Sequence, residues 1–121
     1  MSNAAQIYQR NANASSTPRE TESQILIETA ARFQRIHDNW DAEASALNLT
    51  LLMNRKIWSV FLSSVMMDEC PHPREIRENI ANLAVFIFAR TLELQIEPKR
   101  EMLTALININ RQIAAGLNGR G

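Results

Sequence analysis

Glycine, cysteine and net charge are nearly absent from this chain, and each shortage narrows the classes of protein to which it can belong. The only three glycines, Gly116, Gly119 and Gly121, lie at the carboxyl end, so the sequence offers no glycine turn of the kind that closes β-hairpins. Cys70 is the only cysteine, which excludes an internal disulfide and is compatible with a reducing compartment.

Positive and negative charges balance, with 13 Lys and Arg residues against 13 Asp and Glu residues. This balance gives no net attraction to nucleic acid or to an anionic membrane surface. The longest nearly apolar run, residues 80–89, contains Asn82 and has half of the roughly 20 residues that a membrane span needs. The first ten residues contain no apolar segment that could serve as a secretory signal. We therefore expect a cytoplasmic protein without membrane insertion.

Helix signals, by contrast, run through the whole chain of 121 residues, of which 45% are apolar. Pro18, Pro73 and Pro98 each fit the first position of a helix. Apolar residues at steps of three and four predict four helices, over about 18–38, 42–67, 73–95 and 98–115. The expected fold is an all-α, four-helix bundle-like domain over residues 17–121, with a short polar amino-terminal arm over residues 1–16.

Two of the predicted helices carry more apolar residues than one buried face requires. The helix over 42–67 adds Met53 and Met67 to its stripe, and the helix over 73–95 contains the run LAVFIFA. Such a helix is either central in a core or covered by a partner. The residues that we expect to bind a partner, or else to fill the core, are Trp58, Phe61, Val65, Met66, Phe86 and Phe88.

The pair Asn-Arg occurs twice inside apolar runs, as Asn54-Arg55 in LLMNRKIW and as Asn110-Arg111 in LININRQI. Asn54 precedes Trp58 by four residues, so its amide lies within the apolar stripe, and Asn110 lies within its stripe as well. A buried amide without a partner costs about 1–3 kcal/mol. We therefore expect the two asparagines to face the core, to bond each other or a helix end, and to hold the helices in register. The alternative is a polar Asn-Arg notch that orients a partner helix.

The segments ALNLTLLMNRKIWSVF and LTALININRQIAAGL resemble the two hallmark segments of the flagellar regulator FlaF of alphaproteobacteria. Tyr8-Gln9 and the PRETE of residues 18–22 resemble the amino-terminal part of the same family. The resemblance thus covers nearly the whole chain in order. Asn108 stands where an acidic residue is common in the family, and Lys56 stands where arginine is common.

The resemblance implies a cytoplasmic, non-enzymatic factor without a cofactor that is required for the production and export of flagellin. It implies flagellin as the partner, bound as by a secretion chaperone, and a positive action opposite to that of the companion repressor FlbT. Post-transcriptional control of flagellin translation, with FlbT or with the flagellin mRNA, is the alternative. The flagellar export gate is a further candidate partner. An apolar groove would take an amphipathic partner helix through its residues i, i+3, i+4 and i+7.

Catalysis and metal binding have little support in the sequence. Cys70 and His72, with His37, form the only nucleophile–base set, and no third group is spaced to orient them. A closed zinc site takes four ligands, and CPHP supplies two. We therefore expect no catalytic residue, no metal ligand and no cofactor-binding residue.

Two binding alternatives remain. Direct RNA binding is disfavoured because the arginines are dispersed among glutamates, although several could gather on one face, namely Arg55, Arg74, Arg77, Arg90, Arg100 and Arg111. A homodimeric scaffold would instead hide the apolar surplus between two copies. If the protein is a chaperone, its groove is either open or covered by the chain's own residues 1–16, with Ile7 and Tyr8 as anchors.

Overall fold

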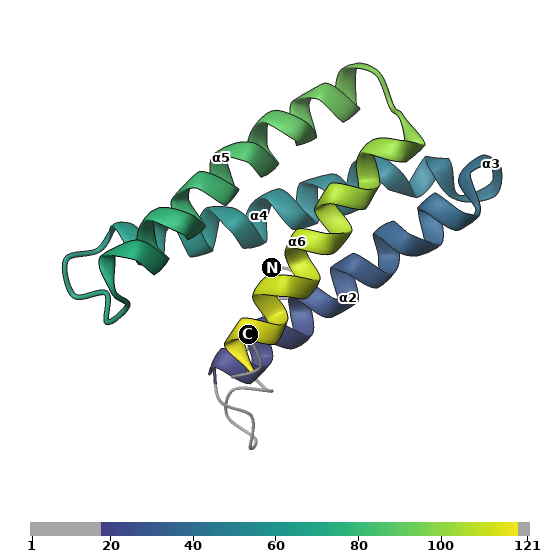
Figure 1. The fold of residues 1–121 in the computed structure, drawn as a ribbon. Coiled ribbons are helices and arrows are strands. Elements are labelled where there is room, and N and C mark those ends of the chain that lie inside the picture. Colours follow the sequence, from purple (N-terminus) through teal and green to yellow (C-terminus); the bar gives the residue numbers. More distant parts are fainter. Residues whose placement is uncertain (1–17, 119–121) are drawn as a thin grey trace, which may run out of the picture.

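The structure is a computed structural model, and it describes residues 18–118. Within these residues four long helices form the fold, and there is no β-strand (Figure 1). The long helices are α2 (Pro18–Asp38), α4 (Leu47–Met66), α5 (Arg74–Ile96) and α6 (Leu103–Leu117). The predicted all-α, four-helix fold is confirmed, whereas the arm over residues 1–16 lies outside the described residues. None of the helices in this part of the chain is long and apolar enough to cross a membrane.

The starts of two helices differ from the prediction. A short helix α3 (Trp40–Glu43) and a 3-10 turn η1 (Ala44–Ala46) precede α4, where the spacing predicts one helix from about residue 42. Pro98 does not open the last helix, because a 3-10 turn η2 (Arg100–Met102) leads into α6. The backbone is extended at Glu97 and at Lys99, on both sides of this proline. The chain therefore needs a few extended residues to pass from the end of α5 to the start of α6.

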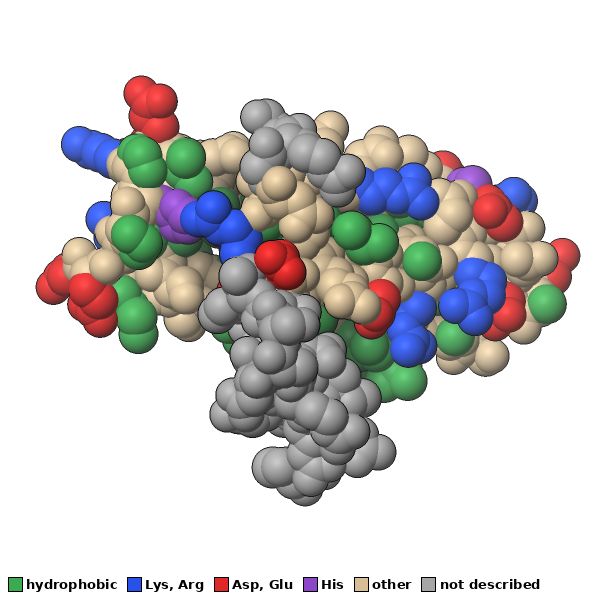
Figure 2. All heavy atoms as spheres, turned by 90° about the horizontal axis from the view of Figure 1, so that it is seen from below, with side chains coloured by type: hydrophobic (Ala, Val, Ile, Leu, Met, Phe, Trp, Pro, Cys, Tyr) green, Lys and Arg blue, Asp and Glu red, His purple; other side chains and the backbone are tan. Residues whose placement is uncertain are grey.

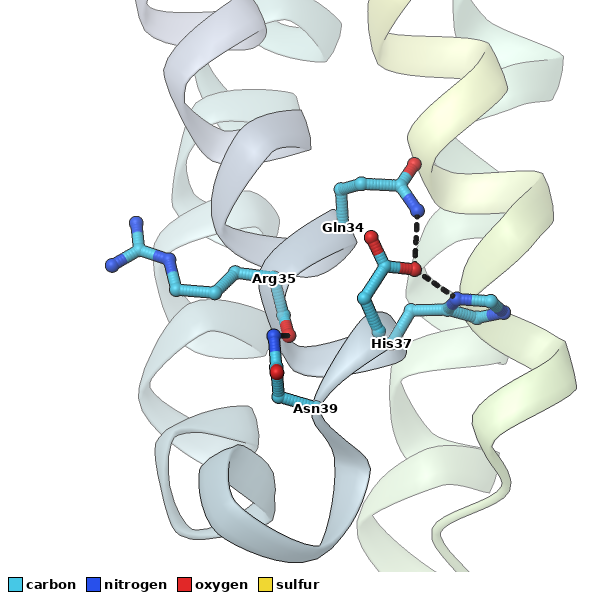
Figure 3. Close-up of polar contacts among 5 residues, drawn as sticks. Gln34, Arg35, His37 and Asn39 are labelled. Carbon is cyan, nitrogen blue, oxygen red and sulfur yellow. Dashed lines mark hydrogen bonds and ion pairs between the residues drawn. The ribbon is translucent and has the colours of Figure 1, made fainter.

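Side chains in the last turn of α2 bond to one another and to the backbone (Figure 3). Asp38 Oδ1 accepts a hydrogen bond from Gln34 Nε2 at 3.0 Å and lies 3.0 Å from His37 Nδ1. These two contacts, that of His37 first, lower the pKa of the exposed Asp38 carboxyl. Asn39 Nδ2 donates to the carbonyl oxygen of Arg35 at 3.0 Å, which satisfies one of the carbonyls that a helix end leaves open. Side-chain bonds thus end α2 before the chain turns into α3.

The helices associate as two close pairs, α2 with α6 and α4 with α5, and contacts between α2 and α4 join the pairs. Figure 1 shows α5 beside α4, on the side away from α2. In the first pair, Ser23 Oγ donates to the carbonyl oxygen of Ala114 at 3.1 Å. In the second pair, Gln95 Nε2 donates to Asn48 Oδ1 at 3.2 Å. Each pair is therefore held by a polar contact in addition to its apolar packing.

Arg77 of α5 closes the carboxyl end of α4. Its Nε donates to the carbonyl oxygen of Val65 at 2.9 Å, and its Nη2 donates to that of Met67 at 3.0 Å. The last carbonyls of a helix have no partner within the helix, so a cation placed there satisfies them and also favours the negative end of the helix dipole. This bond fixes the start of α5 against the end of α4.

The apolar core lies among the four long helices. Its largest fully buried apolar side chains come from all of them, and they are Trp58, Phe33, Leu26, Leu51, Ile87, Leu94, Leu103 and Leu106. Burial of such a side chain contributes about 1.5–3 kcal/mol relative to exposure. The core is therefore the main source of stability in this domain.

A line of three polar groups crosses this core between α4 and α6. Asn110 Nδ2 donates to Asn54 Oδ1 at 2.8 Å, and Trp58 Nε1 donates to Asn110 Oδ1 at 3.0 Å. All three side chains are 0% exposed. We call Asn54, Trp58 and Asn110 the polar triad. The two asparagines face the core and bond each other, one of the arrangements that their positions predict, whereas Arg55 and Arg111 are exposed. With both amides buried, no Asn-Arg notch forms at the surface.

Replacement of Asn110 by leucine tests the role of the polar triad. The variant N110L leaves the Trp58 indole N–H and the Asn54 amide oxygen without their partner in an apolar core. We expect it to fold with a broader urea transition and a free energy of unfolding lower by about 2–4 kcal/mol. Asn108→Leu, at an exposed position of the same helix, is the control and should change stability little. Equal unfolding curves for the two variants would contradict a structural role for Asn110.

Candidate functional site

Half-buried side chains of α5 and α6 form a partly open apolar surface. Unlike α4 and α5, these two helices do not form a close pair among the described elements. Each carries half-buried side chains off its buried stripe, and we call the following six the α5–α6 face: Leu83, Phe86, Arg90, Met102, Ile109 and Ile113. The apolar members pack against the core while part of their surface remains open.

The contacts of α5 with α4 establish the direction of this face. Arg77 and Gln95 lie on one flank of α5, where both bond residues of α4 or its end. Helical spacing places Leu83, Phe86 and Arg90 together on the opposite flank. Figure 1 shows α5 beside α4, whereas α6 crosses in front of α4 and runs toward the start of α2.

A pocket of about 250 Å³ continues the face at one end, where the turn between α4 and α5 meets the start of α2 and the end of α6. Three helices contribute apolar side chains to its lining, namely Phe61, Val65, Ile80, Ile113 and Leu117, and the α4–α5 turn adds Met67 and Pro71. Ile80 belongs to α5 and Ile113 to α6, so both helices contribute to this pocket. Figure 2 shows hydrophobic side chains around a histidine at the left end of the molecule, where the α4–α5 turn lies in Figure 1.

Polar residues that are far apart in the sequence also line this pocket. Cys70 and His72 come from the α4–α5 turn, together with Glu69, and Glu22 comes from the first turns of α2. His37 lies near the other end of α2, in its last turn. Among residues 18–118, no group of three or more His, Cys, Asp and Glu side chains could hold a metal ion. The pocket thus has an apolar lining with acidic residues at its edge.

Burial raises the pKa of the Glu22 carboxyl, and the charge of Arg19 opposes this effect in part. The carboxylate is half-buried beside the apolar lining, and loss of water disfavours its charged form. The charged form of Glu22 is therefore less favourable in the folded protein than in the unfolded chain.

The structure separates the six residues that the sequence proposes for partner binding. Trp58 is a core residue and not a partner-facing one, because it is fully buried and its ring packs edge-on against Phe61, with centroids 5.4 Å apart. Phe61 and Val65 are buried but line the pocket. Met66 is 69% exposed beside the α4–α5 turn.

The two phenylalanines of α5 lie on different flanks. Phe86 belongs to the α5–α6 face, whereas Phe88 is half-buried on the flank that carries Gln95. The residues expected from the sequence to bind a partner include none from α6, whereas the structure adds Ile109 and Ile113 to the α5–α6 face. The sequence contains one signal for them: by helical spacing both isoleucines lie beside, and not within, the apolar stripe that carries Asn110, which indicates incomplete burial.

The chain can now be compared with known families. The family model described as flagellar protein FlaF matches residues 4–117. The chain belongs to the FlaF family. The match includes all four long helices and both Asn-Arg pairs, so the FlaF resemblance of the two hallmark segments is confirmed and the protein is a flagellar one. No curated protein and no solved structure matches the chain.

The pH dependence of stability tests the environment of Glu22. The pKa of Glu22 is higher in the folded state than in the unfolded chain, so the folded state holds this proton more tightly. The contribution of Glu22 to the free energy of unfolding therefore falls as pH rises from 4.5 through the raised pKa of the folded state. We expect Glu22→Gln to be more stable than the unaltered protein in urea at pH 7. The difference should disappear below the ordinary carboxyl pKa of 4.5, where both side chains are neutral. A Glu22→Gln variant that is less stable at pH 7 would show that attraction to Arg19 outweighs burial.

Proposed function

We propose that this FlaF-family protein binds flagellin in the cytoplasm as an export chaperone and acts positively on flagellin production. The observation that carries the proposal is the α5–α6 face, a row of half-buried apolar side chains that ends in a pocket beside a complete core. A surface of this kind suits the apolar side of an amphipathic helix. The family match supports a partner that belongs to the flagellum.

Soft side chains near the pocket also favour a chaperone. Met66 and Met67, at the end of α4, and Ile76, in the first turns of α5, are exposed. Met67 also lines the pocket. Methionine adapts its shape to different neighbours, which suits a surface that receives a flexible secretion substrate. The apolar surface therefore extends from the α5–α6 face around the α4–α5 turn.

Two of the six arginines that could gather on one face are already bonded within the protein, which gives less support to direct contact with flagellin mRNA. Arg74 Nε donates to Glu78 Oε1 at 2.8 Å, and Arg77 is bonded to the carbonyls at the end of α4. Phosphate binding needs cations that are clustered and free to pair with the backbone of the nucleic acid. If translation is the primary target, an action through FlbT accords better with these contacts.

A homodimeric scaffold is the second candidate, and the outer side of α5 favours it. Val85, Leu92 and Ile96 are exposed there and are spaced by seven and four residues, which places them on one side of the helix. This stripe lies on the exposed side of α5 and differs from the α5–α6 face. A second copy could cover it without blocking the pocket.

Titration calorimetry with monomeric flagellin from the same bacterium, at about 0.15 M salt, tests the proposal. We expect a one-to-one complex with a negative change in heat capacity, because binding buries apolar surface. Sedimentation of the protein alone, at the same concentration, reports whether it is already a dimer. If the folded protein binds no flagellin, the chaperone proposal is wrong, and FlbT and the flagellin mRNA leader should be titrated in its place.

A further inference from the structure

We infer that the α5–α6 face recognises a flagellin helix that carries an acidic residue about three helical turns from an apolar anchor. Arg90 would bind the acidic residue, and the pocket would take the anchor. This inference rests on the proposed function, and it adds the chemistry and the spacing by which the partner helix is recognised.

Arg90 is a cation held within an apolar surface. Its Cζ lies 4.9 Å from the centroid of the Phe86 ring, which is a cation–π contact, and its side chain is 27% exposed. Burial on the ring restricts the guanidinium before any partner arrives. An arginine that is ordered in advance loses less conformational entropy when it binds a carboxylate.

The hydrogen-bonding capacity of Arg90 is largely unused within residues 18–118. Its nearest acidic group is Glu93 Oε1, which lies 3.9 Å from Nη1 and belongs to a side chain that is 58% exposed. A pair this long and this exposed contributes little. In the same part of the chain Nε is buried and has no acceptor. A guanidinium has five N–H donors in a planar fork, so most of them are available on the exposed edge.

A carboxylate is the ligand that fits these donors. Arginine binds carboxylates through two parallel N–H···O bonds, and such charge-assisted bonds are stronger than neutral ones. A helix that lies on the α5–α6 face would also exclude water from the guanidinium and thereby strengthen its attraction to the carboxylate. An amphipathic helix with one acidic residue at the edge of its apolar side meets both conditions.

The spacing on the partner follows from the length of α5 between the two ends of the site. Ile80 lines the pocket, and Arg90 lies ten residues further along the same helix, which is about 15 Å at a rise of 1.5 Å per residue. A partner helix along α5 covers this distance in about three turns. Residues eleven positions apart lie on one side of a helix, so the apolar anchor and the acidic residue should be about eleven positions apart.

The charges at the two ends favour one direction of the partner helix. Glu22 and Glu69 line the pocket, whereas Arg90 lies at the other end of the face. A helix placed in the reverse direction would bring its acidic residue to these glutamates and leave Arg90 without an acceptor. Like charges brought together in an interface disfavour such a placement.

The test compares matched arginine variants by titration of monomeric flagellin. Arg90→Met keeps an apolar side chain on Phe86 and removes the fork, and we expect it to weaken binding about tenfold or more. Arg74→Met is the control, because Arg74 also lies on α5 and its side chain is 90% exposed. Urea unfolding of both variants shows whether the fold is intact. Arg90→Lys keeps the charge without the fork, and its affinity should lie between those of the unaltered protein and Arg90→Met.

A double-mutant cycle then locates the acidic residue on the partner. Each acidic residue of the bound flagellin helix is replaced in turn by its amide, and every variant is titrated against the unaltered protein and against Arg90→Met. One replacement should weaken binding to the unaltered protein and leave binding to Arg90→Met unchanged. That residue should lie about eleven positions from a large apolar residue.

The outcomes separate this inference from the proposed function. If flagellin binds the unaltered protein and Arg90→Met equally well, or if no acidic residue couples to Arg90, the inference is wrong while the chaperone function stands. If flagellin does not bind the folded, unaltered protein, the proposed function itself fails. Loss of binding in Arg74→Met equal to that in Arg90→Met would indicate general charge attraction and would overturn the role of Arg90.

Discussion

The hydrogen bonds of the polar triad connect the two helix pairs inside the core. An aliphatic interface between α4 and α6 would tolerate small sliding movements, because apolar contacts have little directionality. The bond from Asn110 to Asn54, at 2.8 Å, and the bond from Trp58 to Asn110, at 3.0 Å, form together in one register only. In residues 18–118 the Nδ2 atom of Asn54 has no acceptor, so even this register leaves one buried donor unpaired. Any other register would leave more donors unpaired and would be less stable.

The surface that we assign to partner binding depends on that register. Because α6 pairs closely with α2 and is bonded to α4, it does not close onto α5. The half-buried residues of both helices are the result, and the positions of Ile109 and Ile113 opposite α5 follow from the position of Asn110 on the same helix. A buried polar contact thus sets the geometry of an apolar surface on the outside of the domain.

Prediction from the sequence succeeded where the signal is local. Proline and the spacing of apolar residues predict four helices. The place of Asn54 and Asn110 within apolar stripes predicts buried amides that bond each other or a helix end, and the structure has the first of these arrangements. The start of α6 was misplaced, because Pro98 fits the first turn of a helix but lies in the extended connection after α5. A proline shows where a helix cannot continue more reliably than where the next one begins.

The candidate site was harder to predict, because it depends on which helices pair. Trp58 and Phe86 look alike in sequence as aromatic residues in apolar runs, but one is in the core and the other on the α5–α6 face. Glu22 and Cys70 line the same pocket because the turn between α4 and α5 lies beside the start of α2. No local pattern reports such a contact. For the same reason, Arg90 could not be distinguished from the other arginines of the chain.

The connection between α4 and α5 joins the two helices and also lines the pocket. Arg77 adds a bond between α5 and the end of α4 that does not involve Cys70 or His72. This side chain ties α5 to the carbonyl of Val65, in the last turn of α4, and to that of Met67, the first residue of the connection. The pairing of the two helices therefore has a direct bond besides the chain that connects them. Those connecting residues include Glu69, Cys70 and His72, which line the pocket. Substitution of Cys70 or His72 would therefore alter the lining of the pocket without removing a partner of Arg77. The lining of the pocket and the pairing of α4 with α5 thus depend on different side chains of this segment.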